Sequence, residues 1–109
     1  MEPRRGPTMN NKFPNRYLIS NQLWGRLTRR MVADRLTHTL DFARLVIDET
    51  LGFLKMHGDF PNQHFSPSGD VDKGWHTFLM YTREYQEFCQ MVANRFIHHE
   101  PNDGEEKKI

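Results

Sequence analysis

The chain has 109 residues, a net charge of +1 and one cysteine, Cys89. This length suits one domain rather than two, and a lone cysteine excludes a disulfide within the chain. The apolar runs are too short to span a bilayer, and none follows the basic N-terminus as in a signal peptide. We therefore predict a small soluble protein of the reducing cytoplasm, with no membrane segment.

Both ends have the composition of disordered segments. Residues 1–16 form a basic arm rich in Pro, Gly and Asn, and residues 102–109 form an acidic tail. Such segments have too little apolar surface to offset the entropy of ordering them. The helical domain should therefore be residues 17–101. A domain this small needs a well-packed core, a metal ion or oligomerisation to stay folded.

The first predicted helix begins after Ser20, with Ser20 or Asn21 as N-cap, and runs to about Arg35. Apolar residues recur at helical spacing on one side of it, and arginines lie largely on the other. The apolar stripe is Leu23, Trp24, Leu27 and Met31, and the arginines are Arg26, Arg29 and Arg30.

The second predicted helix runs from about Leu40 to His57, with Thr37 or Thr39 as N-cap. Gly58 stands where a left-handed terminator is expected. The buried face is marked by Ala43, Val46, Ile47, Thr50, Leu51 and Leu54.

Two shorter helices follow a loop over residues 58–69. The third is predicted over residues 70–81, and Thr82 serves as the N-cap of a fourth over residues 83–93. Asn94 suits a left-handed terminator, so the segment after it should be extended or irregular. The fold class is therefore all-α, a compact and antiparallel bundle of about four helices with disordered termini.

The third helix carries a carboxylate and an imidazole at positions that share a face. Asp72 and His76 lie four residues apart, about one helical turn. A carboxylate at this position can fix the tautomer of a metal-bound histidine. The alternative is a hydrogen bond that only satisfies a half-buried histidine.

Cys89 and the later histidines extend this pair to a possible metal site. If the chain reverses at Thr82, His76 and Cys89 face each other at similar height and offer nitrogen and sulfur to zinc. Either His98 or His99 can join them, because neighbours in an extended segment point to opposite sides. Asp72, His64 or water would complete the tetrahedron. In the alternative interpretation, Cys89 is simply a small buried apolar residue.

These residues resemble the core of a known family. Trp75-His76, then Thr82, Tyr85 and Cys89, then the run from Arg95 to Pro101, are similar to small bacterial proteins described as glycine-rich domain-containing. The resemblance spans about Leu18 to Pro101, and a partial one to the plant proteins of that name spans Ser66 to Asn94. Relatives usually carry glycine where this chain has Asn94, and the glycine-rich tract is absent. The resemblance implies a site around His76, Cys89 and His98 or His99, but no activity.

Two functions fit these observations. The first is a protein-interaction or regulatory module whose partner is another protein, with or without the zinc site, and homo-oligomers are compatible with it. Its exposed aromatic surface would come from Trp24, Phe60, Phe65 and Tyr81.

The alternative is an accessory protein that binds nucleic acid, since residues 1–35 carry eight Lys or Arg against two Asp or Glu. We do not expect an enzyme, because no oxyanion hole is evident and Cys89 lies on an apolar helix face.

Overall fold

The computed structural model describes residues 12–100. Within this range there is no strand, and four α-helices follow one short 3-10 turn. The elements are η2 (Arg16–Leu18), α1 (Asn21–Ala33), α2 (Leu40–Asp59), α3 (Gly69–Leu79) and α4 (Thr82–Ala93). The predicted four-helix, all-α fold is confirmed. The disorder predicted for residues 1–11 and 102–109 falls outside the described residues.

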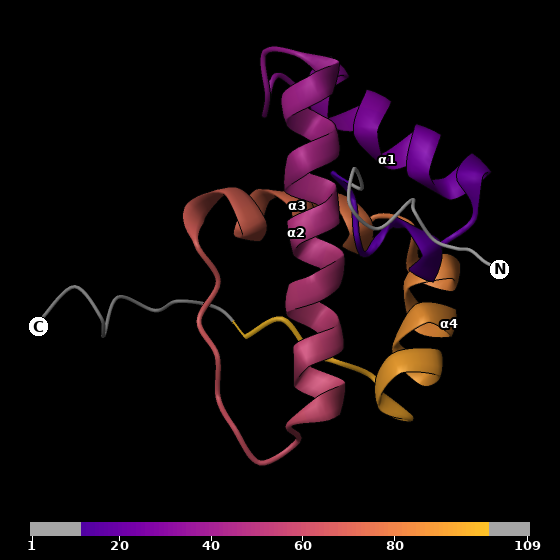
Figure 1. Cartoon of the computed structure of the whole chain (residues 1–109), viewed down its shortest axis with the longest axis vertical. Helices are drawn as coiled ribbons and strands as arrows, with labels where there is room; N and C mark the ends of the chain where they lie inside the picture. Colours follow the sequence, from indigo (N-terminus) through magenta and orange to yellow (C-terminus); the bar gives the residue numbers. More distant parts are fainter. Residues whose placement is uncertain (1–11, 101–109) are drawn as a thin grey trace, which may run out of the picture.

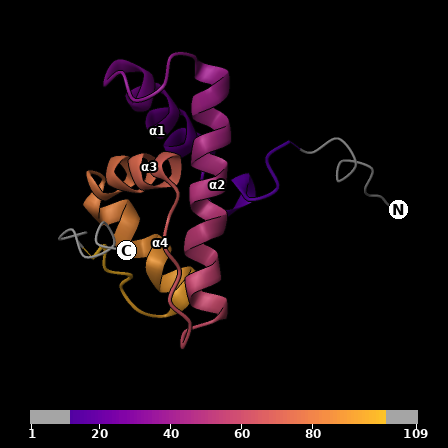
Figure 2. The ribbon, with the colours of Figure 1, turned by 90° about the vertical axis from the view of Figure 1, so that its left-hand side faces the viewer.

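The long helix α2 is the centre of the fold, because it contacts the other three helices and η2. Figures 1 and 2 show α1 and α3 lying across α2, while α4 packs beside its lower half. This crossed arrangement differs from the antiparallel alignment expected from short connections. The core between the helices holds the predicted apolar stripes of α1 and α2, with the inward aromatic residues Trp75, Phe78, Tyr85 and Phe88.

Two glycines permit the close approach of other helices to α2. A Cβ atom added at Gly74 of α3 would lie 2.2 Å from Oγ1 of Thr50. One added at Gly58 would lie 1.9 Å from the backbone oxygen of Val92 in α4. The prediction that Gly58 ends the second helix is therefore wrong, since α2 continues to Asp59. Glycine is required there because two backbones meet.

The structure shows which of the predicted N-cap residues are used in the first two helices. The hydroxyl of Ser20 accepts a hydrogen bond from the N–H of Leu23, and that of Thr39 accepts one from Phe42, each at 3.1 Å. Each bond satisfies a backbone donor that has no partner within its helix. Ser20 and Thr39 are therefore the N-caps of α1 and α2.

Other helix ends differ from expectation by a residue or two. Thr82 is the first residue of α4 rather than its N-cap, which is Tyr81. The first helix ends at Ala33, and Arg35 then takes the left-handed conformation with φ of 61°. The left-handed terminator predicted at Asn94 is confirmed, with φ of 56°.

Residues 12–16 pack on the domain, so the predicted boundary at residue 17 lies inside an ordered segment. The Asn15 backbone N–H donates to Oδ1 of Asp48 at 2.9 Å, and the rings of Phe13 and Trp24 are 5.3 Å apart between centroids. The composition of the N-terminal segment did not reveal the contact between Asn15 and Asp48, because these residues are 33 positions apart in the sequence. Burial raises the pKa of Asp48, although the hydrogen bonds from Asn15 act in the opposite direction.

The aromatic residues proposed for an exposed surface separate into two groups. Trp24 is only 4% exposed, because the N-terminal segment covers it, so its assignment to that surface is wrong. Phe60 is exposed, while Phe65 and Tyr81 are half-buried. No helix within residues 12–100 has the length and apolarity needed to cross a membrane.

Candidate metal centre

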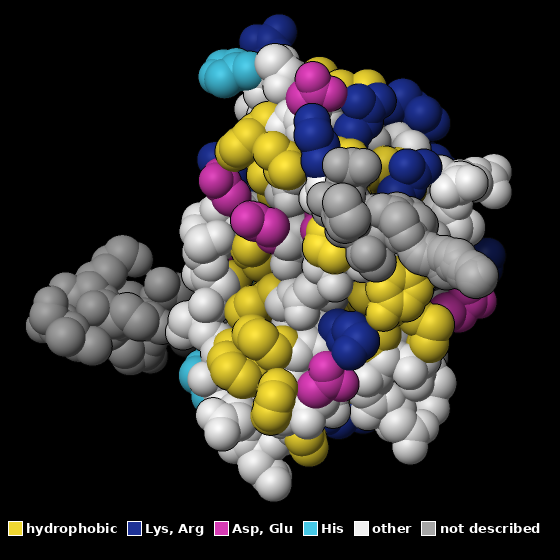
Figure 3. Space-filling model, viewed as in Figure 1, with side chains coloured by type: hydrophobic (Ala, Val, Ile, Leu, Met, Phe, Trp, Pro, Cys, Tyr) yellow, Lys and Arg dark blue, Asp and Glu magenta, His cyan; other side chains and the backbone are white. Residues whose placement is uncertain are grey.

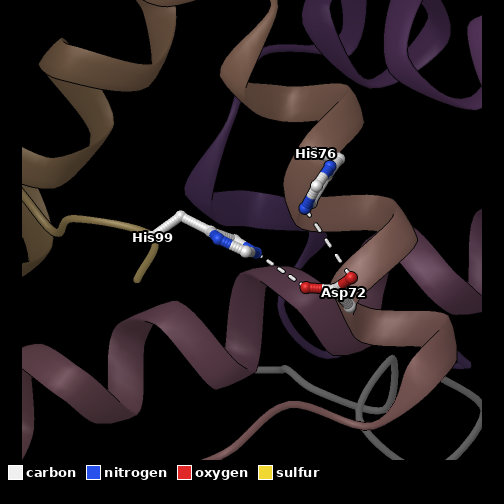
Figure 4. A group of neighbouring side chains, drawn as sticks. All are labelled: Asp72, His76 and His99. Atoms are coloured by element: carbon white, nitrogen blue, oxygen red, sulfur yellow. Dashed lines mark hydrogen bonds and ion pairs between the residues drawn. The ribbon is translucent and has the colours of Figure 1, made fainter. Parts of the chain in front are cut away.

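Three side chains from two segments converge on one point of the surface. Asp72 and His76 lie one turn apart on α3, and His99 reaches them from the segment that follows α4 (Figure 4). His99 Nε2 is 2.7 Å from Oδ1 of Asp72, and His76 Nε2 is 3.6 Å from Oδ2 of the same aspartate. One donor atom from each residue lies within 4.8 Å of the other two.

A buried hydrogen-bond relay positions His99. The indole N–H of Trp75 donates to the Tyr85 hydroxyl at 2.8 Å, and this hydroxyl donates to the backbone oxygen of Ile97. The Ile97 side chain is 1% exposed and anchors the segment in the core. His99 lies two residues further along the non-helical segment, on the same side as Ile97, and so meets α3.

Trp75 closes the inner side of the site, while the outer side is open to solvent. Its ring lies edge-on to that of His99, with centroids 4.4 Å apart. The His76 and His99 rings are also 4.4 Å apart between centroids, and nearly perpendicular. The His99 side chain is 16% exposed, against 42% for Asp72 and 60% for His76. The group therefore has one protected wall and room for water or a further ligand.

The structure decides between the two C-terminal histidines. His98 is exposed and packs against the Phe96 ring, with centroids 4.8 Å apart, so His99 is the one that joins Asp72 and His76. The sequence could not make this choice, because Phe96 and Ile97 are both apolar and alternation from them turns opposite histidines inward; burial of Ile97, with Phe96 exposed, selects His99.

The predicted sulfur ligand is not part of this group. Cys89 is fully buried in the apolar core, where its thiol lies beside the Tyr85 hydroxyl and the backbone N–H of Ile97. His64 also lies outside the group, on the exposed loop before α3. The candidate ligand set is therefore corrected to Asp72, His76 and His99, because the inward face of α4 points to the core.

Two nitrogens and one carboxylate oxygen form a donor set that borderline divalent cations accept. Zinc binds such atoms at about 2.0–2.2 Å, which places donors about 3.3 Å apart in a tetrahedron. The separations of 2.7 and 3.6 Å run to different oxygens of Asp72, and one donor atom from each residue lies within 4.8 Å of the other two, so small side-chain rotations would bring the three atoms to this spacing. An ionised carboxylate only accepts hydrogen bonds, so His99 Nε2 carries the proton toward Asp72. A metal ion at Nε2 would require the other neutral tautomer, with the ring proton moved to Nδ1 and the lone pair on Nε2 free.

The relay beneath the site makes folding stability sensitive to alkaline pH. Burial raises the pKa of both Tyr85 and Cys89, so each keeps its proton longer in the folded chain than in the unfolded chain. Their contribution is complete below the ordinary values, about 8.5 for cysteine and 10 for tyrosine, and is lost as the pH rises toward the folded values. We expect urea unfolding at pH 7, 9 and 10.5 to show a free energy of unfolding that falls from about pH 8.5 upward. Cys89→Ala should flatten the first part of that fall, and an equal slope in this variant would contradict the assignment.

Comparison with known proteins identifies one family. A model of the family described as UCP032817-like matches residues 13–108. No curated protein and no solved structure matches the chain. The family match says nothing of the glycine-rich domain proteins, so that resemblance stays a prediction.

Proposed function

The chain belongs to the UCP032817-like family, and we propose that it is a small metal-binding module that holds one zinc ion between Asp72, His76 and His99. The description of the family names no activity, so the proposal rests on the residues themselves. The observation that carries it is the convergence of two imidazoles and one carboxylate within 4.8 Å on a wall formed by a buried tryptophan.

The arrangement supports a regulatory role for the metal. Asp72 and His76 belong to a regular helix, whereas His99 belongs to a segment without regular structure. A bound ion would hold this segment against α3, and loss of the ion would leave it attached by Ile97 and the Tyr85 hydroxyl. A partner protein that reads the position of residues 95–100 would then respond to zinc. A cytoplasmic location stays a prediction from the single cysteine.

Zinc is favoured over harder cations by the donor atoms. Imidazole nitrogen suits Zn²⁺, Cu²⁺ and Ni²⁺, whereas Mg²⁺ and Ca²⁺ prefer all-oxygen sites. Three protein ligands with an open fourth position also match zinc sites that keep a water molecule or bind a ligand. Metal binding should weaken on acidification, because protons compete for the two imidazole nitrogens.

We expect the full chain, purified without a metal column, to bind about one zinc ion in isothermal titration calorimetry. At a free zinc concentration 100 times the Kd, binding should stabilise the fold by about 2.7 kcal/mol. This corresponds to a rise in Tm of about 10 °C or more for a domain of this size. Chelator should reverse the shift.

Adjacent histidines provide the matched control. His99→Gln should remove the Tm rise and weaken zinc binding at least tenfold, while His98→Gln should leave both unchanged. Equal losses in both variants, or no zinc binding by the unmodified chain, would refute the site. Loss of zinc in Cys89→Ser with retention in His99→Gln would instead support a sulfur ligand.

A further inference from the structure

A second recessed site lies away from the metal centre, where η2, α1 and the start of α2 meet. It is a hollow of about 350 Å³, a volume within the usual range for small-molecule sites. The half-buried Phe13 and Leu40 supply apolar wall with the buried Trp24 behind it, and three arginines supply charge. Figure 3 shows Lys and Arg side chains gathered over α1, the helix that forms part of this wall.

The three arginines come from three elements and line the same hollow, whose described lining holds no acidic residue. Arg16 belongs to η2, Arg29 to α1 and Arg44 to α2. Three guanidinium groups around one hollow repel each other unless an anion lies between them. The arrangement is therefore suited to a ligand with negative charge.

Each guanidinium retains donors for such a ligand. Arg16 donates to Oδ1 of Asn21 at 3.2 Å and lies 5.0 Å from the centroid of the Trp24 ring, while its buried Nε has no acceptor. Arg29 makes no ion pair within residues 12–100. Arg44 pairs at 2.9 Å with Asp41, whose side chain is 92% exposed, so the pair is weak and easily exchanged.

Gly25 allows Arg29 to reach the hollow. A Cβ atom at Gly25 would lie 2.8 Å from Nη1 of Arg29, so the guanidinium of this exposed residue lies over the glycine backbone. The other two arginines of α1 are engaged elsewhere. Arg26 pairs with Glu84 and lies over the Tyr81 ring, and Arg30 pairs with Asp34 at 2.8 Å.

We propose that this hollow binds the phosphate group of a small phosphorylated molecule, with Arg16, Arg29 and Arg44 as its donors. Guanidinium groups donate paired N–H bonds that match phosphate oxygens, and three of them can serve the three terminal oxygens of a phosphomonoester. The hollow is larger than phosphate alone requires, and its apolar wall suits a planar or apolar remainder. The ligand is therefore a phosphomonoester rather than free phosphate. This site is independent of the proposed zinc ion.

The test uses the full chain and three probes: phenyl phosphate, benzoate and inorganic phosphate. We expect saturable binding of phenyl phosphate in NMR titration, with the largest shifts at the Trp24 indole N–H and the Arg29 side chain. Benzoate and inorganic phosphate should bind at least tenfold more weakly. Arg29→Gln and Arg44→Gln should each weaken phenyl phosphate binding about tenfold, and Arg26→Gln, with the same change in net charge, should not.

Several results would overturn the proposal. One is the absence of saturable binding by phenyl phosphate. Another is an equal loss in Arg26→Gln, which would indicate diffuse attraction to the basic surface. A third is equal affinity for inorganic phosphate and phenyl phosphate, which would mean that the apolar wall does not contribute to binding. Tighter binding of a short DNA duplex, with shifts at Arg26 and Arg30 as well, would indicate nucleic acid instead.

Discussion

Replacement of Gly58 by alanine is expected to lower the free energy of unfolding by about 3 kcal/mol or more. The added methyl group would lie 1.9 Å from the backbone oxygen of Val92, and a backbone atom cannot rotate away as a side chain can. Overpacking of this kind usually costs about 1–3 kcal/mol, and more where backbone must move. The measurement is the midpoint and slope of urea unfolding, monitored by the circular dichroism signal of the helices.

Two variants separate close approach from helix termination at this position. Gly58→Asn should destabilise the fold at least as much as Gly58→Ala, although asparagine is a good left-handed terminator. Gly69→Ala is the control, since a Cβ there meets nothing within 4 Å and should change stability by at most about 1 kcal/mol. Tolerance of asparagine at position 58 would show that the helices do not meet there as described.

Replacement of Tyr85 by phenylalanine is expected to cost about 2–4 kcal/mol. The tyrosine hydroxyl accepts from the Trp75 indole and donates to the Ile97 backbone oxygen, and the residue is 1% exposed. Its removal leaves one buried donor and one buried acceptor without a partner, at about 1–3 kcal/mol each. Urea unfolding measures the loss, and Tyr17→Phe, at a side chain that is 74% exposed, is the control.

The same variant connects the relay to the proposed zinc site. With the Ile97 carbonyl released, the segment that carries His99 should become mobile, and hydrogen exchange of residues 95–100 should accelerate. Zinc binding should weaken while Asp72 and His76 remain in place. If Tyr85→Phe lowers stability but leaves exchange in this segment unchanged, the hydroxyl does not hold the segment.

The helices and most of their ends were predictable, because local chemistry sets them. The stripe from Leu23 to Met31, the hydroxyl of Thr39 and the left-handed Asn94 each act within a few residues of their own positions. The third helix appeared as predicted apart from one or two residues at its ends. Asp72 and His76 could be paired for the same reason, since helical geometry alone places them on one face.

Contacts across the chain were not predictable from such patterns. Cys89 was placed beside His76 by assuming that α3 and α4 run back along each other, but Cys89 is fully buried in the core, and His99 meets Asp72 and His76 instead. The docking of Asn15 on Asp48 and the meeting of Gly58 with Val92 depend equally on tertiary arrangement. In each case the sequence contained the residue without its partner.

The contact between Asp72 and His99 has a topological consequence. It joins positions 27 residues apart, and the whole of α4 lies between them. An ion bound there would close this stretch into a ring in the folded chain, and it would stabilise that ring by binding to the folded state rather than by restricting the unfolded chain. A chain with one cysteine cannot form a disulfide with itself, and a coordinated metal would give its folded state a link of this kind in a reversible form.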